Sequence, residues 1–219
     1  MKQQIKNLLG IERRKHWVTQ VGSIPFKSGL GDSAWLLHGL CRSMKPSVCV
    51  EIGSARGKSA CYVATALREN GQGHLYAIDP HAPTNWNDSE SVETYDLMRK
   101  NLAQLGLDGF VTLVRQDSVS AAKEWTKPID LLFIDGDHSY EGAKADWINF
   151  SKFINPFGLV VFHDTLWDLR PDPRFQRTDM GVPRLVEELR REGYPVLTID
   201  KDYGVSIVQP VRNGCALSM

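Results

Sequence analysis

The sequence predicts an α/β fold: a Rossmann-like, doubly wound sheet of seven mostly parallel strands with an antiparallel last strand, in a single domain. Three observations predict this class. From Val48 onward, short apolar runs alternate with longer amphipathic runs, which is the pattern of βαβ units. The length of 219 residues suits one substantial core. No internal repeat, linker or low-complexity tract divides the chain.

The elements follow in order along the chain. Residues 1–47 are expected to form an N-terminal cap of helix and loop, and residues 48–219 the main domain. The predicted strands are 48–52, 74–78, 111–115, 129–134, 158–162, 195–199 and 204–208. Glycine and aspartate beside the last two strands are typical of a hairpin, so the sheet should close with an antiparallel member. The predicted helices are 33–43, 58–69, 91–105, 118–125, 140–153 and 183–192.

Composition and charge exclude several classes of function. The 26 basic and 26 acidic side chains cancel, so no global field attracts nucleic acid or an anionic membrane, and the expected partner is a small molecule. No segment approaches the roughly 20 apolar residues of a membrane span. The four cysteines show no CxxC spacing, which favours reduced core thiols over disulfides or zinc ligands; they are Cys41, Cys49, Cys61 and Cys215. We therefore expect a cytoplasmic protein.

A glycine turn follows the first predicted strand. Glu51 ends the strand, and Gly53 and Gly57 lead into a helix, where main-chain amides and the helix N-terminus can approach a ligand closely. The pattern is neither GxGxxG nor a P-loop, which argues against pyrophosphate cofactors. The turn therefore predicts a site for the nucleoside part of a cofactor.

Two further acids follow the next two strands. Asp79 lies about 20 residues beyond the turn, where a carboxylate can accept from ribose hydroxyls. Asp117 follows the third strand, with Ser118 beside it. Taken singly, each acid could equally be a helix N-cap or a loop residue. Together they mark the edge of the sheet where ligands should collect.

A second cluster is predicted at the ends of the fourth and fifth strands. The fourth strand delivers Asp135, Asp137 and His138, and the fifth delivers His163 and Asp164. Because neighbouring parallel strands end at the same edge, these side chains could converge on one divalent cation. Asp137 could instead cap the helix that starts near Tyr140.

The glycine turn resembles the first motif of the class I S-adenosylmethionine-dependent methyltransferases, Glu51-Ile-Gly53-Ser-Ala-Arg-Gly57, and the resemblance covers about residues 48–208. It implies that the turn lines the methionine and ribose, that Asp79 binds the ribose diol, and that Asp117 and Ser118 lie by the adenine. The cofactor-binding residues that it implies are Glu51, Gly53, Ser54, Gly57, Ser59, Asp79, Asp117, Ser118 and Asp135.

The second cluster is similar to a branch of metal-dependent O-methyltransferases related to macrolide-sugar and cephalosporin-cluster enzymes. The motifs are Ile134-Asp-Gly-Asp-His-Ser-Tyr140, Asn155-Pro-Phe-Gly158 and Val161-Phe-His-Asp-Thr165. The resemblance implies that Asp135, His163 and Asp164 hold magnesium and that His138 is the catalytic base. His163 stands where the characterised sugar enzymes carry an acid, and an imidazole ligand shifts metal preference toward manganese, iron or zinc.

The resulting hypothesis is transfer of a methyl group from S-adenosylmethionine to a hydroxyl of a small metabolite, with a sugar or a diol as the candidates, assisted by magnesium or manganese. Two alternatives stay open: a nucleotide-dependent oxidoreductase on a related sheet, and a non-catalytic module that binds the cofactor. A homo-oligomer is compatible with the sequence. Trp86 and Trp167 border the predicted active edge and are hypothetical lid residues.

Overall fold

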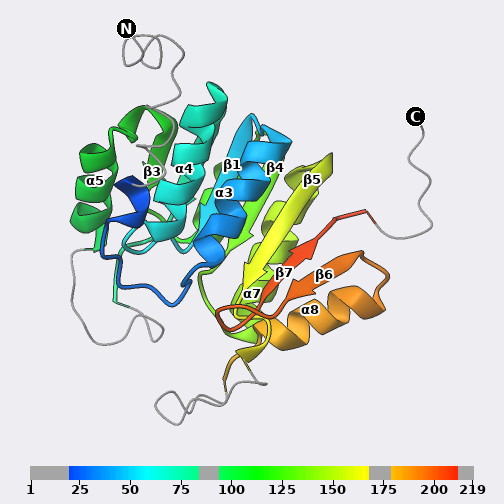
Figure 1. The fold of residues 1–219 in the computed structure, drawn as a ribbon. Helices are drawn as coiled ribbons and strands as arrows, with labels where there is room; N and C mark the ends of the chain where they lie inside the picture. The colour runs from blue at the N-terminus through cyan, green and yellow to red at the C-terminus, as the bar shows by residue number, and fades with distance from the viewer. Residues whose placement is uncertain (1–19, 84–93, 168–178, 212–219) are drawn as a thin grey trace, which may run out of the picture.

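One mixed sheet of seven strands organises the chain. The computed structural model describes residues 20–83, 94–167 and 179–211. Its strands are β1 (Val48–Ile52), β2 (His74–Ile78), β3 (Val111–Val114), β4 (Ile129–Ile134), β5 (Ile154–His163), β6 (Val196–Ile199) and β7 (Val205–Val208). They lie in the order β3-β2-β1-β4-β5-β7-β6 (Figure 1).

The strand directions confirm the predicted fold class. From β3 across to β5 every neighbouring pair is parallel, whereas β7 runs antiparallel to both β5 and β6. The chain order reverses between β1 and β4, which lie side by side in the sheet. In open α/β sheets, ligands bind outside the carboxyl ends of the strands at such a reversal. The predicted cofactor turn and the predicted metal cluster both flank this point.

Helices cover both faces of the sheet. Residues of α3 (Ser33–Met44), α4 (Lys58–Asn70) and α5 (Thr94–Leu105) form a core with one face. Residues of α6 (Ser118–Glu124), α7 (Tyr140–Phe150) and α8 (Val182–Arg191) form a second core with the other. Figure 1 shows α3 lying in front of the sheet beside α4. Short 3₁₀ helices span Asp108–Phe110 and Ser151–Phe153.

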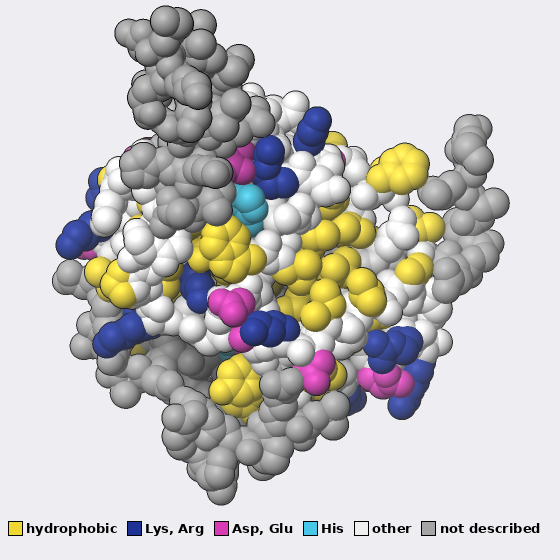
Figure 2. All heavy atoms as spheres, in the orientation of Figure 1, with side chains coloured by type: hydrophobic (Ala, Val, Ile, Leu, Met, Phe, Trp, Pro, Cys, Tyr) yellow, Lys and Arg dark blue, Asp and Glu magenta, His cyan; other side chains and the backbone are white. Residues whose placement is uncertain are grey.

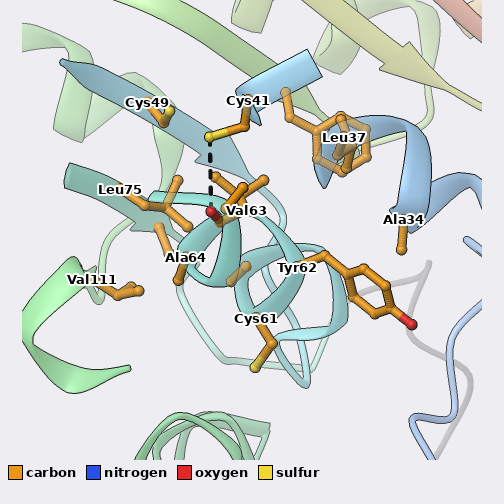
Figure 3. Packing of buried hydrophobic residues seen from close by; sticks show 14 of the residues in the cluster. Ala34, Leu37, Cys41, Cys49, Cys61, Tyr62, Val63, Ala64, Leu75 and Val111 are labelled. Carbon is orange, nitrogen blue, oxygen red and sulfur yellow. Dashed lines mark hydrogen bonds between the residues drawn. The ribbon is translucent and has the colours of Figure 1, made fainter. Parts of the chain in front are cut away.

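The first core is built around α4, whose residues from Ser59 to Leu67 are all buried. A helix that is buried on every side needs small or apolar residues all round, and α4 supplies alanine, valine, cysteine and leucine. In Figure 3, Val63 and Ala64 lie near Leu75 of β2, and the Cys41 thiol of α3 donates to the Val63 carbonyl at 3.8 Å. Cys41, Cys49 and Cys61 are free and buried, as predicted; Cys215 lies outside the described residues.

The second core shows the period expected of an amphipathic helix. Val182, Leu185, Val186 and Leu189 of α8 are buried at the spacing i, i+3, i+4 and i+7. Trp147 of α7 packs with the sheet in this core, its ring centroid 6.1 Å from that of Phe162. Trp147 therefore joins α7 to the sheet.

Several element boundaries differ from the sequence prediction, that of β5 by the most, and one predicted helix cap is wrong. β5 begins at Ile154 rather than at 158, because Ile154 already pairs with Ile129 before the register shifts beside Pro156. The cap of α7 is Ser139, whose hydroxyl accepts from the Gly142 amide at 3.0 Å. Asp137 was therefore the wrong residue for the cap; its carboxylate accepts from the Ser139 amide at 2.8 Å instead.

The surface carries an apolar area over part of the sheet. Figure 2 shows hydrophobic side chains gathered over β5, β7 and β6, where Leu197 is 60% exposed. Leu159 and Ile207 are partly buried against the first core. Within the described ranges no helix is both long and apolar enough to cross a membrane.

Candidate active site

The glycine turn between β1 and α4 is held against the rest of the sheet by its own backbone. Gly53 has φ +87°, and a Cβ there would lie 2.1 Å from the Asp135 carbonyl oxygen. Its amide donates to the Ile78 carbonyl at 2.9 Å, so the ends of β1, β2 and β4 meet at this residue. Gly57 has φ +81° and comes just before α4; a Cβ there would lie 2.7 Å from the Met98 side chain. Both glycines are thus required by the fold itself.

Two buried polar atoms beside this turn have no protein partner. The Ser59 hydroxyl donates to Oε1 of Glu51, but Glu51 Oε2 makes no hydrogen bond, and neither does Ser54 Oγ. Both residues are 2% exposed. Burial raises the pKa of Glu51 to about 8, although the Ser59 hydrogen bond opposes the rise. Unpaired buried polar atoms are costly, and a ligand with hydrogen-bonding groups would satisfy them.

Asp79 connects the end of β2 to the glycine turn. Its two carboxylate oxygens accept from the amides of Ala55 at 2.8 Å and His81 at 2.6 Å. Each oxygen keeps a second lone pair, so a ribose hydroxyl can still be bound. The His81 ring is buried, and its Nδ1 lies 2.9 Å from the Thr94 hydroxyl. The ribose role of Asp79 stays a prediction.

Asp117 is the N-cap of α6. Its carboxylate accepts from the Ser120 amide at 2.8 Å, and this hydrogen bond lowers the pKa of the exposed acid. The capping interpretation, which the sequence left open, therefore describes the contact of Asp117 in this structure. An adenine contact for Asp117 and Ser118 stays a prediction.

Asp146, a buried acid in contact with Ser118, was not among the residues predicted from the sequence. Asp146 of α7 is 3% exposed and hydrogen-bonds to Ser118, and burial raises its pKa to about 7. A usable signal was present, because Asp146 stands next to Trp147 on a helix face that also buries Ala143 and Phe150. A charged residue type on such a face needs a partner.

The ends of β4 and β5 bring the predicted metal and base residues together. One ligand atom each from Asp135, His138 and Asp164 lies within 4.8 Å of the others. His138 Nδ1 is 3.3 Å from Asp164 Oδ2. His163 Nδ1 is 3.1 Å from Asp135 Oδ1 and 3.2 Å from Asp164 Oδ1. Four side chains from two neighbouring strand ends therefore surround one small volume.

His163 is the most deeply placed member of this cluster, at 3% exposure. Its Nε2 lies 2.8 Å from the backbone carbonyl of Asp202, so that nitrogen must carry the hydrogen. Burial disfavours a charged ring, but Asp135 and Asp164 outweigh it and hold the pKa of His163 well above its ordinary value. Without a cation, Nδ1 therefore also carries a hydrogen, which it donates toward these carboxylates. Asp164 itself has φ +58°, a strained conformation for a residue with a Cβ and a feature that clusters at functional sites.

The donor set fits a divalent cation. The group whose ligand atoms all lie within 4.8 Å of one another is Asp135, His138 and Asp164, so the predicted base, and not His163, completes it. His163 Nδ1 forms ion pairs with the two carboxylates at 3.1 and 3.2 Å, and its proton would have to leave before it could bind a cation. Histidine ligands usually donate their other ring N–H to a carbonyl or carboxylate, as His163 does to Asp202. Two carboxylates with one imidazole suit manganese as well as magnesium.

Three aromatic residues near the predicted active edge remain to be placed. Trp167 lies three residues after Asp164, and its ring stacks on Tyr203 with centroids 4.5 Å apart. The Tyr140 hydroxyl donates to Glu188 at 2.6 Å and links α7 to α8. Trp86 lies outside the described residues, so its lid role stays a prediction.

Comparison with known proteins identifies the family to which the chain belongs. Residues 50–165 match a family model described as a methyltransferase domain. The chain is 29% identical over 146 residues to the uncharacterized protein y4gI of Sinorhizobium fredii; the match covers 61% of this chain but only 15% of that protein.

Solved structures share the fold. S-adenosylhomocysteine-bound Podospora anserina methyltransferase PaMTH1 aligns with a TM-score of 0.65 at 16% identity, over 89% of this chain and 86% of that one. The Bacillus cereus O-methyltransferase in complex with S-adenosylhomocysteine aligns with a TM-score of 0.59 at 18% identity, over 94% and 96%. The matched model covers more than half of the chain, from within β1 to just beyond β5, and the chain therefore belongs to the methyltransferase-domain family, with the class I fold.

Proposed function

We propose that the protein is an S-adenosylmethionine-dependent O-methyltransferase that acts on a hydroxyl of a small metabolite with help from a divalent cation. One observation carries the proposal. The glycine turn and the carboxylate–imidazole cluster are in direct contact, because the backbone of Gly53 packs against the carbonyl of Asp135. A methyl donor held by the turn would thus lie beside an acceptor held by the cluster.

The cofactor side of this proposal rests on Glu51 and Ser54. Their buried oxygens, Glu51 Oε2 and Ser54 Oγ, have no protein partner and would need hydrogen bonds from a ligand. The methionine and ribose parts of the cofactor carry groups that can form such hydrogen bonds. Asp79 adds a carboxylate fixed to the turn through the Ala55 amide. The turn lacks the GxGxxG pattern of dinucleotide sites, which argues against an oxidoreductase.

The acceptor side rests on Asp135, His163 and Asp164, which would hold the cation. When bound, the cation would lower the pKa of a coordinated hydroxyl and fix its orientation, most effectively for two vicinal oxygens. The sulfonium methyl is already activated, so the protein has to align the acceptor and remove its proton. Asp164, 3.3 Å from His138 Nδ1, would stabilise the imidazolium that forms when His138 takes that proton.

Calorimetry with S-adenosylhomocysteine tests the cofactor. Binding in the micromolar range is expected, and NADH should give no heat of binding. Absence of S-adenosylhomocysteine binding at high micromolar concentration would contradict the proposal. Incubation of metabolite extracts with S-adenosylmethionine that carries an isotope-labelled methyl group, followed by mass spectrometry, then identifies the acceptor.

The role of His138 is tested with His138→Gln. General-base catalysis contributes roughly 10²–10⁴-fold to the rate, so turnover should fall by that factor while S-adenosylhomocysteine affinity changes little. His74→Gln is the matched control, because the His74 ring lies 2.8 Å from the Thr112 hydroxyl at the first residue of β2, the opposite end of the strands from the cluster. Equal activity of the two variants would exclude His138 as the base.

A further inference from the structure

A series of contacts links the candidate metal cluster to α3. The backbone carbonyl of Asp202, in the turn between β6 and β7, accepts from His163 Nε2 at 2.8 Å. A carbonyl oxygen can only accept, so this contact dictates which ring nitrogen carries a hydrogen. The ring is thereby oriented with Nδ1 toward Asp135 and Asp164.

The Asp202 carbonyl is directed at the ring by an unusual backbone. Asp202 and Tyr203 have φ of +47° and +67°, and Gly204 follows at +93°. Left-handed conformations of residues with a Cβ cost on the order of 1–3 kcal/mol and persist only where surrounding contacts impose them. Something outside the turn must therefore hold it.

The Asp202 side chain provides that restraint. One of its carboxylate oxygens accepts from both the amide and the hydroxyl of Ser33, at 2.8 and 2.9 Å, at the first turn of α3. Gly31 makes room for the carboxylate, because a Cβ at that position would lie 2.3 Å from Asp202 Oδ1. The carbonyl of Gly31 in turn accepts from Lys58, the first residue of α4. The chain of contacts thus begins at the cofactor turn and ends at His163.

From these contacts we propose that Asp202 is a positioning residue: its carboxylate, bound by Ser33, fixes the backbone carbonyl that orients His163 and turns Nδ1 toward Asp135 and Asp164, the two carboxylates of the candidate cation site. The inference rests on the proposed function for the cation, but the orientation of the ring is independent of it. Residues that support a metal ligand in this way typically contribute 10–100-fold to metal affinity.

Asp202→Gly removes the carboxylate that Ser33 binds. It adds no backbone strain, because glycine adopts a positive φ freely. Ser33→Ala removes one of the two hydrogen bonds and serves as a milder variant. Asp32→Asn is the matched control, because Asp32 is an exposed acid one residue from Ser33 that pairs with Lys201. It changes the charge near the turn without touching Asp202 or His163.

The first readout is the His163 ring in the metal-free protein, observed by long-range ¹H–¹⁵N NMR. A protonated Nε2 whose hydrogen exchanges slowly is expected in the wild type and in Asp32→Asn, with exchange protection lost in Asp202→Gly. An unprotonated Nε2 in the wild type, or a ring signal that Asp202→Gly leaves unchanged, would overturn the inference.

The second readout is the affinity and visible absorption spectrum of Co²⁺. Asp202→Gly should weaken Co²⁺ binding at least 10-fold and alter the spectrum, Ser33→Ala should do so less, and S-adenosylhomocysteine affinity should stay within about threefold. Wild-type affinity and spectrum in Asp202→Gly would also overturn the inference. If the wild type binds neither Co²⁺ nor Mn²⁺ while the NMR result holds, the positioning role of Asp202 stands and the cation in the proposed function is excluded.

Discussion

Single residues in the candidate site carry costs that only a function or a partner would justify. Glu51 is the clearest case, since its carboxyl is buried with one oxygen unpaired and its pKa is raised to about 8. The folded protein therefore prefers the protonated acid. This stabilising effect is complete below the unfolded pKa near 4.5 and is lost as the pH rises through about 8.

Glu51→Gln should remove this pH dependence, because glutamine stays neutral. Relative to the wild type, the variant should gain on the order of 2 kcal/mol or more in unfolding free energy between pH 5 and pH 9. Urea denaturation across that range measures the difference. Glu124→Gln, at an exposed position, is the control, and parallel curves for Glu51→Gln and the wild type would contradict the burial argument.

The identity of Gly53, in contrast, follows from a contact within the fold. Gly53→Ala would place a Cβ 2.1 Å from the Asp135 carbonyl at φ +87°, so the unfolding free energy should fall by about 2–4 kcal/mol. Gly29→Ala provides the comparison, because nothing lies within 4 Å of its Cβ position. Equal denaturation midpoints for the two variants would show that β1 and β4 do not meet this closely.

Within the helices, replacing two glycines by alanine should change the unfolding free energy in opposite directions. Gly39 of α3 is exposed with open space around its Cβ position, so Gly39→Ala should stabilise the protein by about 0.5–1 kcal/mol. Gly142 of α7 lies under Asp137, whose Cγ would be 2.3 Å from an added Cβ, so Gly142→Ala should destabilise it. Thermal denaturation of both variants checks the pair, and a shift of the same sign in both would refute the assigned packing of α7.

For the whole molecule, the proposed cofactor should act as a stabilising ligand. At a concentration 100 times its dissociation constant, S-adenosylhomocysteine should add about 2.7 kcal/mol, which corresponds to a rise of roughly 5–10 °C in the melting temperature of a chain of this size. Scanning fluorimetry measures it. A rise with NADH instead would favour the oxidoreductase alternative. Oligomeric state and cellular location stay predictions.

Residue patterns along the chain are enough to predict the order and type of the elements and the strand ends that carry chemistry. Alternating short and long apolar runs specified all seven strands, and Glu51, Asp135 and Asp164 were found because each follows such a run. These features are local, so the periodicity of neighbouring residues was enough to reveal them.

Which of these groups meet, and what holds them in place, depends on how distant segments of the chain pack together. Ser33 and Asp202 are 169 residues apart, and the group that orients His163 is a backbone carbonyl, which every residue type possesses. The early start of β5 before Pro156 likewise depended on pairing with Ile129 across the sheet. Contacts of this kind arise when distant segments pack together, and no residue pattern along the chain encodes them.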